Sequence, residues 1–476
     1  MTGPSDNRVS PTLLQRVIAN PGPYIRKSLS PSWWTKKVQT RLRKRRNIAL
    51  EHKLEAIGAG DYTGIQAFRD AHLKAILRYA ARHCPYYRDL FRSHGLRPED
   101  PTAFTSLPLL DRRIIRQHYA RLISDRLTSI EHYLDKTGGS TGEPLVFPTT
   151  VDVGEVATLH HEFLYRQHGY VPGDIVVGLV GSGPSIPPDR VARGVYWAEN
   201  TSAHPIWGRF LFYSCLATSE ALPHMLRQIV ELGPAFLRGY PSFVAKLATY
   251  IRETGQRFPG TLKGIDLSSE TATRDQIDSI RDAFHTTVFL QYGHHELSVY
   301  AYTIDDSYEY RCSPLYGITE VLGVDGRHVA IGEMGEVVVT GFFNNVLPFV
   351  RYRTGDLAVF GGNEYGVVKL REIVGRSQDY LVAPDGRRIW LTGILTGCSK
   401  DQYFFRNVRQ FQLVQETIGR VTVRVVKADG FGDADAAGIR YAIKDICGIE
   451  AECDLVDFIP LTLGGKVQYV VQKIPG

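Results

Sequence analysis

The sequence predicts an α/β protein with a large N-terminal domain, whose sheets are covered by helices, and a small C-terminal α+β domain. Short apolar runs bounded by glycine alternate with helical patterns, as in sheets that are covered on both faces. The pattern changes after Arg371 to a β-β-α-β order. The 476 residues, 43% of them hydrophobic, suffice for one large core and a second, smaller one.

The large domain shows helix and strand patterns in alternation. Ile65–Ala81 is predicted to be a helix, because Phe68, Leu73, Ile76 and Leu77 fall on one face. Ile175–Val180 is a short apolar run bounded by glycines, which is typical of a buried strand. The other elements are predicted as helices over Pro223–Leu232 and Ser242–Glu253, and as strands over Thr286–Gln291 and Glu336–Thr340.

The last hundred residues form a separate unit in this interpretation. Its predicted strands are Gln410–Gln415, Val421–Lys427 and Ala451–Val456, with a helix over Asp433–Cys447. The predicted organisation is a basic N-terminal extension over 1–60, a large domain over 61–374, a joint at 375–379 and a small domain over 380–476.

Positive charge is concentrated near the N-terminus. The formal net charge is +6, but Arg26–Lys53 holds ten Lys and Arg and one acid, so the rest of the chain sums to +6 − 9 = −3. Trp33 and Trp34 lie beside this basic run. A solvated extension is one interpretation, and weak peripheral contact of residues 26–53 with an anionic membrane surface is another. Nucleic-acid binding through Arg41–Arg46 is a third, although no nucleic-acid partner is expected.

The chain lacks the marks of secretion or membrane insertion. It has no run of about 18 apolar residues and no apolar signal stretch near residue 1. The six cysteines are scattered without a CxxC pair, which argues against a zinc site or a disulfide framework. A cytoplasmic location is therefore expected, with the inner face of the membrane as the alternative.

A glycine- and hydroxyl-rich stretch is the most specific local signal. Thr137-Gly138-Gly139-Ser140-Thr141-Gly142-Glu143-Pro144 has three glycines that let the backbone approach an anion, and three hydroxyl donors. It has no Gly-Lys-Ser/Thr ending, so it is not a Walker-type loop. The stretch predicts either a polyphosphate-binding loop or a polar surface turn.

Three further constellations lie downstream. Gln291–Glu296 follows a predicted strand, where Tyr292 offers an aromatic face and Glu296 offers a hard oxygen for Mg²⁺. Arg351–Asp356 places Asp356 after a glycine turn, where it would accept bonds from ribose hydroxyls. Leu463–Gln468 places Lys466 on a glycine hairpin. Each has an ordinary structural alternative: a strand-to-helix turn, a β-turn and a solvated lysine.

Taken in order, these stretches resemble the motif series of the adenylate-forming superfamily, which includes acyl-CoA synthetases, nonribosomal adenylation domains and luciferases. Within it, the chain looks most like the phenylacetate–CoA ligase branch, which includes CapK-type proteins. The series is Thr137–Pro144, Ser268-Ser269-Glu270, Tyr292–Glu296, Arg353–Asp356, Gly375-Arg376 and Gly465-Lys466, and the branch is supported by His83–Arg88 and Leu107–Arg112.

The resemblance implies a two-step reaction. ATP and a carboxylic acid give an acyl-adenylate and pyrophosphate, and a nucleophile then takes the acyl group and releases AMP. The implied cofactors are ATP and Mg²⁺, with coenzyme A slightly favoured as acceptor. An amine, a sugar hydroxyl or a carrier-protein thiol are the alternative acceptors, and the small domain is implied to be mobile.

The resemblance also implies roles for individual residues. Thr137, Gly138, Gly139, Ser140, Thr141 and Gly142 would hold the β- and γ-phosphates, and Ser269, Glu270, Tyr292, Gly293, Asp356 and Arg376 would bind the rest of the nucleotide. Glu296 would hold Mg²⁺, His295 would stand beside it as a catalytic residue, and Lys466 would bridge the carboxylate and the α-phosphate. Gln378 and Asp379 would form the hinge, and Trp197, Phe236 and Tyr240 would line an apolar acid pocket.

Three positions depart from the family pattern. Glu143 stands where many relatives carry Lys, His295 where they carry Thr or Ser, and Gln378 at the usual hinge Asp or Lys. These departures leave a catalytically impaired binding or scaffold protein as a second hypothesis.

Overall fold

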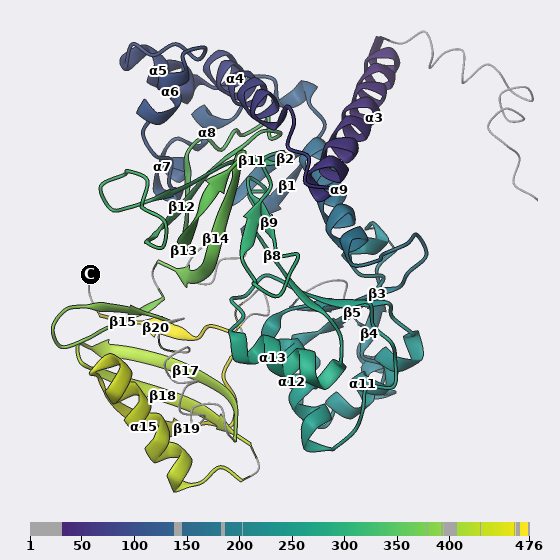
Figure 1. The fold of residues 1–476 in the computed structure, drawn as a ribbon, viewed down its shortest axis with the longest axis vertical. Helices are drawn as coiled ribbons and strands as arrows, with labels where there is room; N and C mark the ends of the chain where they lie inside the picture. The colour runs from purple at the N-terminus through teal and green to yellow at the C-terminus, as the bar shows by residue number, and fades with distance from the viewer. Residues whose placement is uncertain are drawn as a thin grey trace, which may run out of the picture.

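The structure is a computed structural model that describes residues 31–137, 145–181, 186–201, 203–377, 379–391, 394, 407–428, 430–460, 462 and 467–474; the side chains of 31–39, 101 and 102 are not described. A sheet of twelve strands runs through the large domain in the order β11-β12-β13-β14-β10-β9-β8-β7-β6-β3-β5-β4 (Figure 1). No helix among these residues is both long and apolar enough to cross a membrane.

The parallel part of this sheet contains four neighbouring pairs: β5 with β3, β3 with β6, β6 with β7 and β7 with β8. The bounds are β3 Val176–Val180, β4 Trp197–Glu199, β5 Phe210–Tyr213, β6 Phe236–Gly239, β7 Gly264–Leu267 and β8 Val288–Gly293. Three helices cover one face: α11 (Leu222–Leu232), α12 (Pro241–Glu253) and α13 (Arg274–Phe284). Helix α9 (Val151–Gln167) covers the other face.

The antiparallel part of the sheet continues from β8. Its strands are β9 Tyr300–Tyr302, β10 Tyr310–Cys312, β11 Gly317–Leu322, β12 Met334–Gly341, β13 Tyr352–Glu364 and β14 Val367–Arg376. Short helices pack against it near the N-terminus: α4 Ile65–His83, α5 Pro85–Ser93, α6 Pro101–Ser106, α7 Arg112–Gln117 and α8 Tyr119–Leu122. A hairpin of β1 (His132–Lys136) and β2 (Val146–Thr150) precedes α9, and α10 (Pro188–Ala192) follows β3.

The C-terminal part has its own sheet and core. The strand order is β19-β18-β17-β20, with β17 Val408–Thr417, β18 Arg420–Lys427, β19 Glu450–Leu455 and β20 Val470–Gln472, and helix α15 (Asp433–Cys447) packs on it. A small hairpin of β15 (Tyr380–Val382) and β16 (Arg388–Trp390) joins this core. The predicted α/β class and the predicted elements are confirmed, with ends that differ by a few residues.

The basic N-terminal segment packs on the body for part of its length. Helix α3 (Pro31–Gly58) contacts α9, and its first turns extend away from the rest of the molecule (Figure 1). Arg43 pairs with Glu131 and Asp152, and Arg46 with Asp152 and Glu155. The interpretation of this segment as a solvated extension is therefore corrected for Arg43 and Arg46, which are held in ion pairs. Arg41, Lys44 and Arg45 are exposed, as that interpretation predicts.

Candidate active site

The carboxyl ends of β7 and β8 bring two of the predicted stretches, Ser268–Glu270 and Tyr292–Glu296, to one edge of the sheet. This edge is where open parallel sheets bind ligands. Ser269, just beyond β7, has φ 73°, a left-handed conformation that is uncommon for a residue with a Cβ atom. Leu297, just after Glu296, has φ 49°. Such strain at a strand end is typical of functional sites.

Tyr292, Asp356 and Arg376 come together at this edge. The Tyr292 hydroxyl donates to Asp356 Oδ2 at 2.8 Å, and Arg376 Nε lies 3.0 Å from Asp356 Oδ1. Arg376 Nη1 also donates to the Thr354 carbonyl at 3.1 Å. Burial and the Asp356 charge raise the pKa of Tyr292, so this hydroxyl stays protonated and donates. The carboxylate is thus held from two sides.

Glu296 is buried among polar groups. Its side chain is 3% exposed, and its Oε1 accepts from the Tyr352 hydroxyl at 2.6 Å. His294 Nδ1 lies 3.1 Å from Oε2, and Arg112 Nη2 lies 3.6 Å from Oε1. Burial alone would raise the pKa of Glu296, but His294, the Tyr352 bond and Arg112 outweigh it and hold the pKa well below its usual range. Glu296 is therefore ionised.

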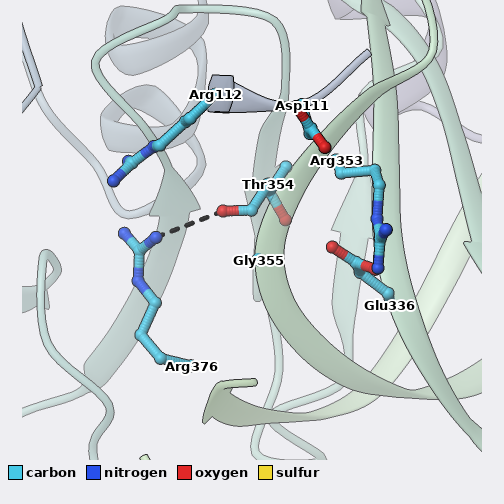
Figure 2. A pocket seen from close by; sticks show the side chains of 7 residues that line it. All are labelled: Asp111, Arg112, Glu336, Arg353, Thr354, Gly355 and Arg376. Atoms are coloured by element: carbon cyan, nitrogen blue, oxygen red, sulfur yellow. Dashed lines mark hydrogen bonds and ion pairs between the residues drawn. The ribbon is translucent and has the colours of Figure 1, made fainter. Parts of the chain in front are cut away.

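A cleft opens beside these groups. It has a volume of about 190 Å³ and is lined by Asp111, Arg112, Glu336, Arg353, Thr354, Gly355 and Arg376. Figure 2 shows Arg112 and Arg376 pointing into the same space from different elements. Arg353 and Glu336 lie next to each other on the opposite side of the cleft (Figure 2), with Arg353 Nε 2.8 Å from Glu336 Oε2. Arg112 and Arg376 give this side of the cleft a positive character that suits phosphate oxygens.

Arg112 and Tyr352 were not among the predicted site residues. Arg112 lies in the Leu107–Arg112 stretch, which the sequence marked only as a branch feature, and Arg112 Nε donates to the Tyr352 hydroxyl at 3.3 Å. His294 was also not predicted as a site residue, because the family resemblance assigned the catalytic role to His295. The pairing of Arg112 with a strand 240 residues away depends on the tertiary fold, so a single sequence gave no signal for it.

Glu270 joins the large domain to the loop that carries Lys466. Its Oε2 accepts from the Ser242 backbone N–H at 3.1 Å, near the start of α12. Its Oε1 accepts from the Val467 N–H at 3.4 Å. Lys466 itself lies outside the described residues, but its neighbour Val467 is therefore held at the same sheet edge.

Comparison with known proteins gives similarities in sequence and in fold. No family model matches the chain. The chain is 25% identical over 413 residues to Protein CapK of Staphylococcus aureus, covering 83% of this chain and 86% of that protein. It is 25% identical over 352 residues to the phenylacetate-coenzyme A ligase of Escherichia coli, covering 69% and 75%. These similarities support the predicted resemblance to the adenylate-forming superfamily. A crystal structure of 2-hydroxyisobutyryl-CoA ligase with R3-HIB-AMP shares the fold at TM-score 0.66 and 19% identity, covering 85% and 88%.

The predicted phosphate loop can be placed only at its first residue, Thr137. Thr137 is buried, and its N–H and Oγ1 pair with the Leu145 backbone at 2.9 Å each. Residues 138–144, which include Gly138, Gly139, Ser140, Thr141, Gly142 and Glu143, lie outside the described residues. The loop therefore joins β1 to β2, and its phosphate role stays a prediction.

His295 points away from Glu296. Its side chain is 54% exposed and its Nδ1 lies 3.8 Å from Asp135 of β1. The histidine that contacts Glu296 is His294, because the backbone turns after β8 ends at Gly293. The catalytic role of His295 stays a prediction.

The joint between the domains is partly described. Gly375 has φ 115°, a conformation that favours glycine, and Arg376 ends β14. Burial raises the pKa of Asp379 to about 6, against the opposing effect of Arg376. Gln378 lies outside the described residues. The hinge function of these residues stays a prediction.

The predicted acid-pocket residues do not form one site. Phe236 is fully buried in the core, with ring centroids 4.9 Å from Tyr165 and 6.5 Å from Phe289. Trp197 lies on β4 at the end of the sheet, where Arg190 stacks on it at 5.0 Å. Only Tyr240, next to the end of β6, lies at the predicted sheet edge. The prediction that Trp197 and Phe236 line the acid pocket is therefore corrected. The face of the strand on which a side chain lies decides whether it lines a pocket or packs in the core, and the identity of a single residue does not reveal that face.

Proposed function

We propose that this protein activates a carboxylic acid as an acyl-adenylate and transfers the acyl group to a nucleophile. The observation that carries the proposal is that Arg112 and Arg376 line one cleft and contact Glu296 and Asp356, so that four separate segments meet there. The similarity to CapK and to phenylacetate-coenzyme A ligase supports the same chemistry.

The nucleotide would bind with its ribose hydroxyls on Asp356. Tyr292 and Arg376 fix both carboxylate oxygens of this residue, so the acceptor geometry exists before the ligand arrives. Tyr292 therefore serves to position Asp356, in addition to the expected stacking on adenine. The glycine-rich loop 138–142 would hold the leaving pyrophosphate.

Glu296 is the residue that would hold Mg²⁺. The described residues contain no group of three or more His, Cys, Asp or Glu that could bind a metal. One carboxylate still fits, because Mg²⁺ in nucleotide sites is held by one or two carboxylates, phosphate oxygens and water. The ion would neutralise phosphate charge. Glu296 is kept ionised for this role, and Arg112 would add a fixed positive charge beside the phosphates.

In the first step, the acid's carboxylate oxygen would bond to the α-phosphorus while the bond to pyrophosphate breaks. Lys466 would stabilise the charge that gathers at this centre, and losing one such group costs on the order of 10²–10³-fold in rate. In the second step, the acceptor would bond to the acyl carbon and AMP would leave. Coenzyme A is slightly favoured as acceptor, and an amine, a hydroxyl or a carrier-protein thiol is the alternative.

Separating the two steps tests the proposal. Lys466→Ala should abolish adenylate formation and leave transfer from a pre-made acyl-adenylate largely intact, measured by mass spectrometry with coenzyme A and with amines present. An equal loss of both steps would contradict the role of Lys466 in the first step alone. Thioester against amide products would identify the acceptor.

A further inference from the structure

A cluster of polar side chains is buried between the sheet and α9, close to the candidate active site. Asp266 of β7 lies at its centre, and its Oδ2 accepts from the Tyr165 hydroxyl at 3.0 Å and from Gln291 Nε2 at 2.8 Å. Arg238 Nε of β6 lies 3.3 Å from the same oxygen. The Arg238 guanidinium stacks on Trp207 at 4.9 Å, and Trp207 contacts His161 of α9 at 3.9 Å.

Three polar atoms of this cluster have no hydrogen-bond or ion-pair partner among the described residues. They are Asp266 Oδ1, His161 Nδ1 and the Tyr300 hydroxyl. Asp266, His161 and Tyr300 are each at most 5% exposed, so bulk water does not compensate them. An unpaired buried polar group costs about 1–3 kcal/mol, and buried polar atoms are almost always paired. Three such atoms in one cluster leave hydrogen-bonding capacity for a further polar group.

The cluster reaches the end of β8. Tyr300 is the β-sheet partner of Gly293, the last residue of β8, and Gln291 precedes Tyr292. Because side chains alternate along a strand, Gln291 and Tyr300 share the α9 face while Tyr292 faces Asp356. An acid with its carboxylate at the end of β8 would place its other end in the cluster. Arg238 and Trp207 keep partial exposure at the rim.

The charges in the cluster balance. Arg238 and Asp266 form an opposed pair, and burial together with Arg238 lowers the pKa of His161 well below its usual value, so the imidazole is neutral. A ligand with an extra net charge would be buried without compensation, which is costly. The unpaired atoms include an acceptor at Asp266 Oδ1 and a donor at the Tyr300 hydroxyl, and a hydroxyl group can satisfy both kinds.

We infer that this cluster is the specificity site of the acid pocket and that it selects carboxylic acids bearing a hydroxyl substituent. The inference rests on the proposed function. It replaces the apolar pocket that the sequence predicted with a neutral, hydrogen-bonding one. A site built to bond a hydroxyl group rejects the analogue that lacks it, because its own polar atoms are then left unpaired.

Matched acid pairs test the inference: phenylacetate with 4-hydroxyphenylacetate, and butyrate with 3-hydroxybutyrate, compared by kcat/KM in ATP–pyrophosphate exchange. The hydroxylated member of at least one pair should be favoured by more than tenfold. Tyr300→Phe should reduce that preference about tenfold, the value of one hydrogen bond, while exchange with the unsubstituted acid is unchanged.

Two control variants separate binding from structure. Tyr213 also has a buried hydroxyl without a partner, but on β5 outside the cluster, so Tyr213→Phe should leave the preference unchanged. Tyr165→Phe removes a hydroxyl that already bonds Asp266 and should lower thermal stability, whereas Tyr300→Phe should not.

The outcomes distinguish this inference from the proposed function. Exchange with unsubstituted acids only, or a hydroxyl preference that survives Tyr300→Phe, would overturn the specificity site and leave the ligase proposal standing. No exchange with any acid would overturn both.

Discussion

Arg351 is buried where residues 105–110 meet the antiparallel part of the sheet. Its guanidinium forms a two-point bond with Glu320, at 2.9 and 3.1 Å, and donates to the carbonyls of Thr105 and Leu107 at 2.7 and 2.8 Å. Its own carbonyl accepts from the Leu110 N–H at 2.9 Å. These bonds fix the segment that ends in Asp111 and Arg112, both of which line the cleft.

Arg351→Met should lower the unfolding free energy by about 3–5 kcal/mol. The substitution leaves the Glu320 carboxylate, 3% exposed, without its main partner, and removing one member of a buried ion pair has a cost of this size. The carbonyls of Thr105 and Leu107, the second of them buried, also lose this donor. The measurement is urea unfolding followed by circular dichroism, with the slope compared between variants.

A double-mutant cycle isolates the pair. Glu320→Gln combined with Arg351→Met should recover about 1–2 kcal/mol relative to Arg351→Met alone, because no unpaired charge then stays buried. If Arg351→Met costs less than about 1 kcal/mol, or the double variant is no more stable than the single one, the Arg351–Glu320 contact does not hold this segment as described.

Three further predictions follow from other contacts. Tyr292→Phe should raise the KM for ATP about tenfold in steady-state kinetics, because Asp356 loses one of its two positioning groups; an unchanged KM would count against that role. Arg43→Met should lower the unfolding free energy by about 1 kcal/mol, measured as a slightly lower melting temperature. Arg45 is exposed, so Arg45→Met should leave the melting temperature unchanged. Equal effects of the two substitutions would mean that the Arg43 ion pairs contribute nothing to stability. The raised pKa of Asp379 predicts stability that is present below about pH 4 and lost as pH rises through about 6; Asp379→Asn should remove about 1–2 kcal/mol of this dependence in unfolding measured from pH 4 to 8, and an identical profile would refute it.

The elements of the fold were readable from the sequence because hydrophobic periodicity reports local structure directly. The helix predicted over Asp433–Cys447 has those ends in the structure, and the predicted run Ile175–Val180 became β3 with one residue fewer. Hydrophobic periodicity does not predict which face of a strand packs against a helix and which face lines a pocket. Phe236 was therefore predicted to line a pocket, although its side chain packs in the core.

Candidate site residues could be predicted from the sequence where an acidic residue stands at a position that has few structural explanations. Glu296 after a buried strand and Asp356 after a glycine turn were found in this way, and the structure brings both to the same region. The partners that tune them were not, because Arg112, Tyr352 and His294 reach Glu296 only through long-range packing. The cluster around Asp266 was missed for the same reason, since the register of β6, β7 and β8 creates it.

The central claim is that this protein forms an acyl-adenylate, and ATP–pyrophosphate exchange measures that step directly. Labelled pyrophosphate should enter ATP in the presence of Mg²⁺ and at least one carboxylic acid from a panel that includes the matched pairs above. Glu296→Gln should reduce this exchange by on the order of 10²-fold or more at an unchanged melting temperature. An absence of exchange with every acid, together with no binding of ATP, would contradict the account and favour a binding or scaffold protein.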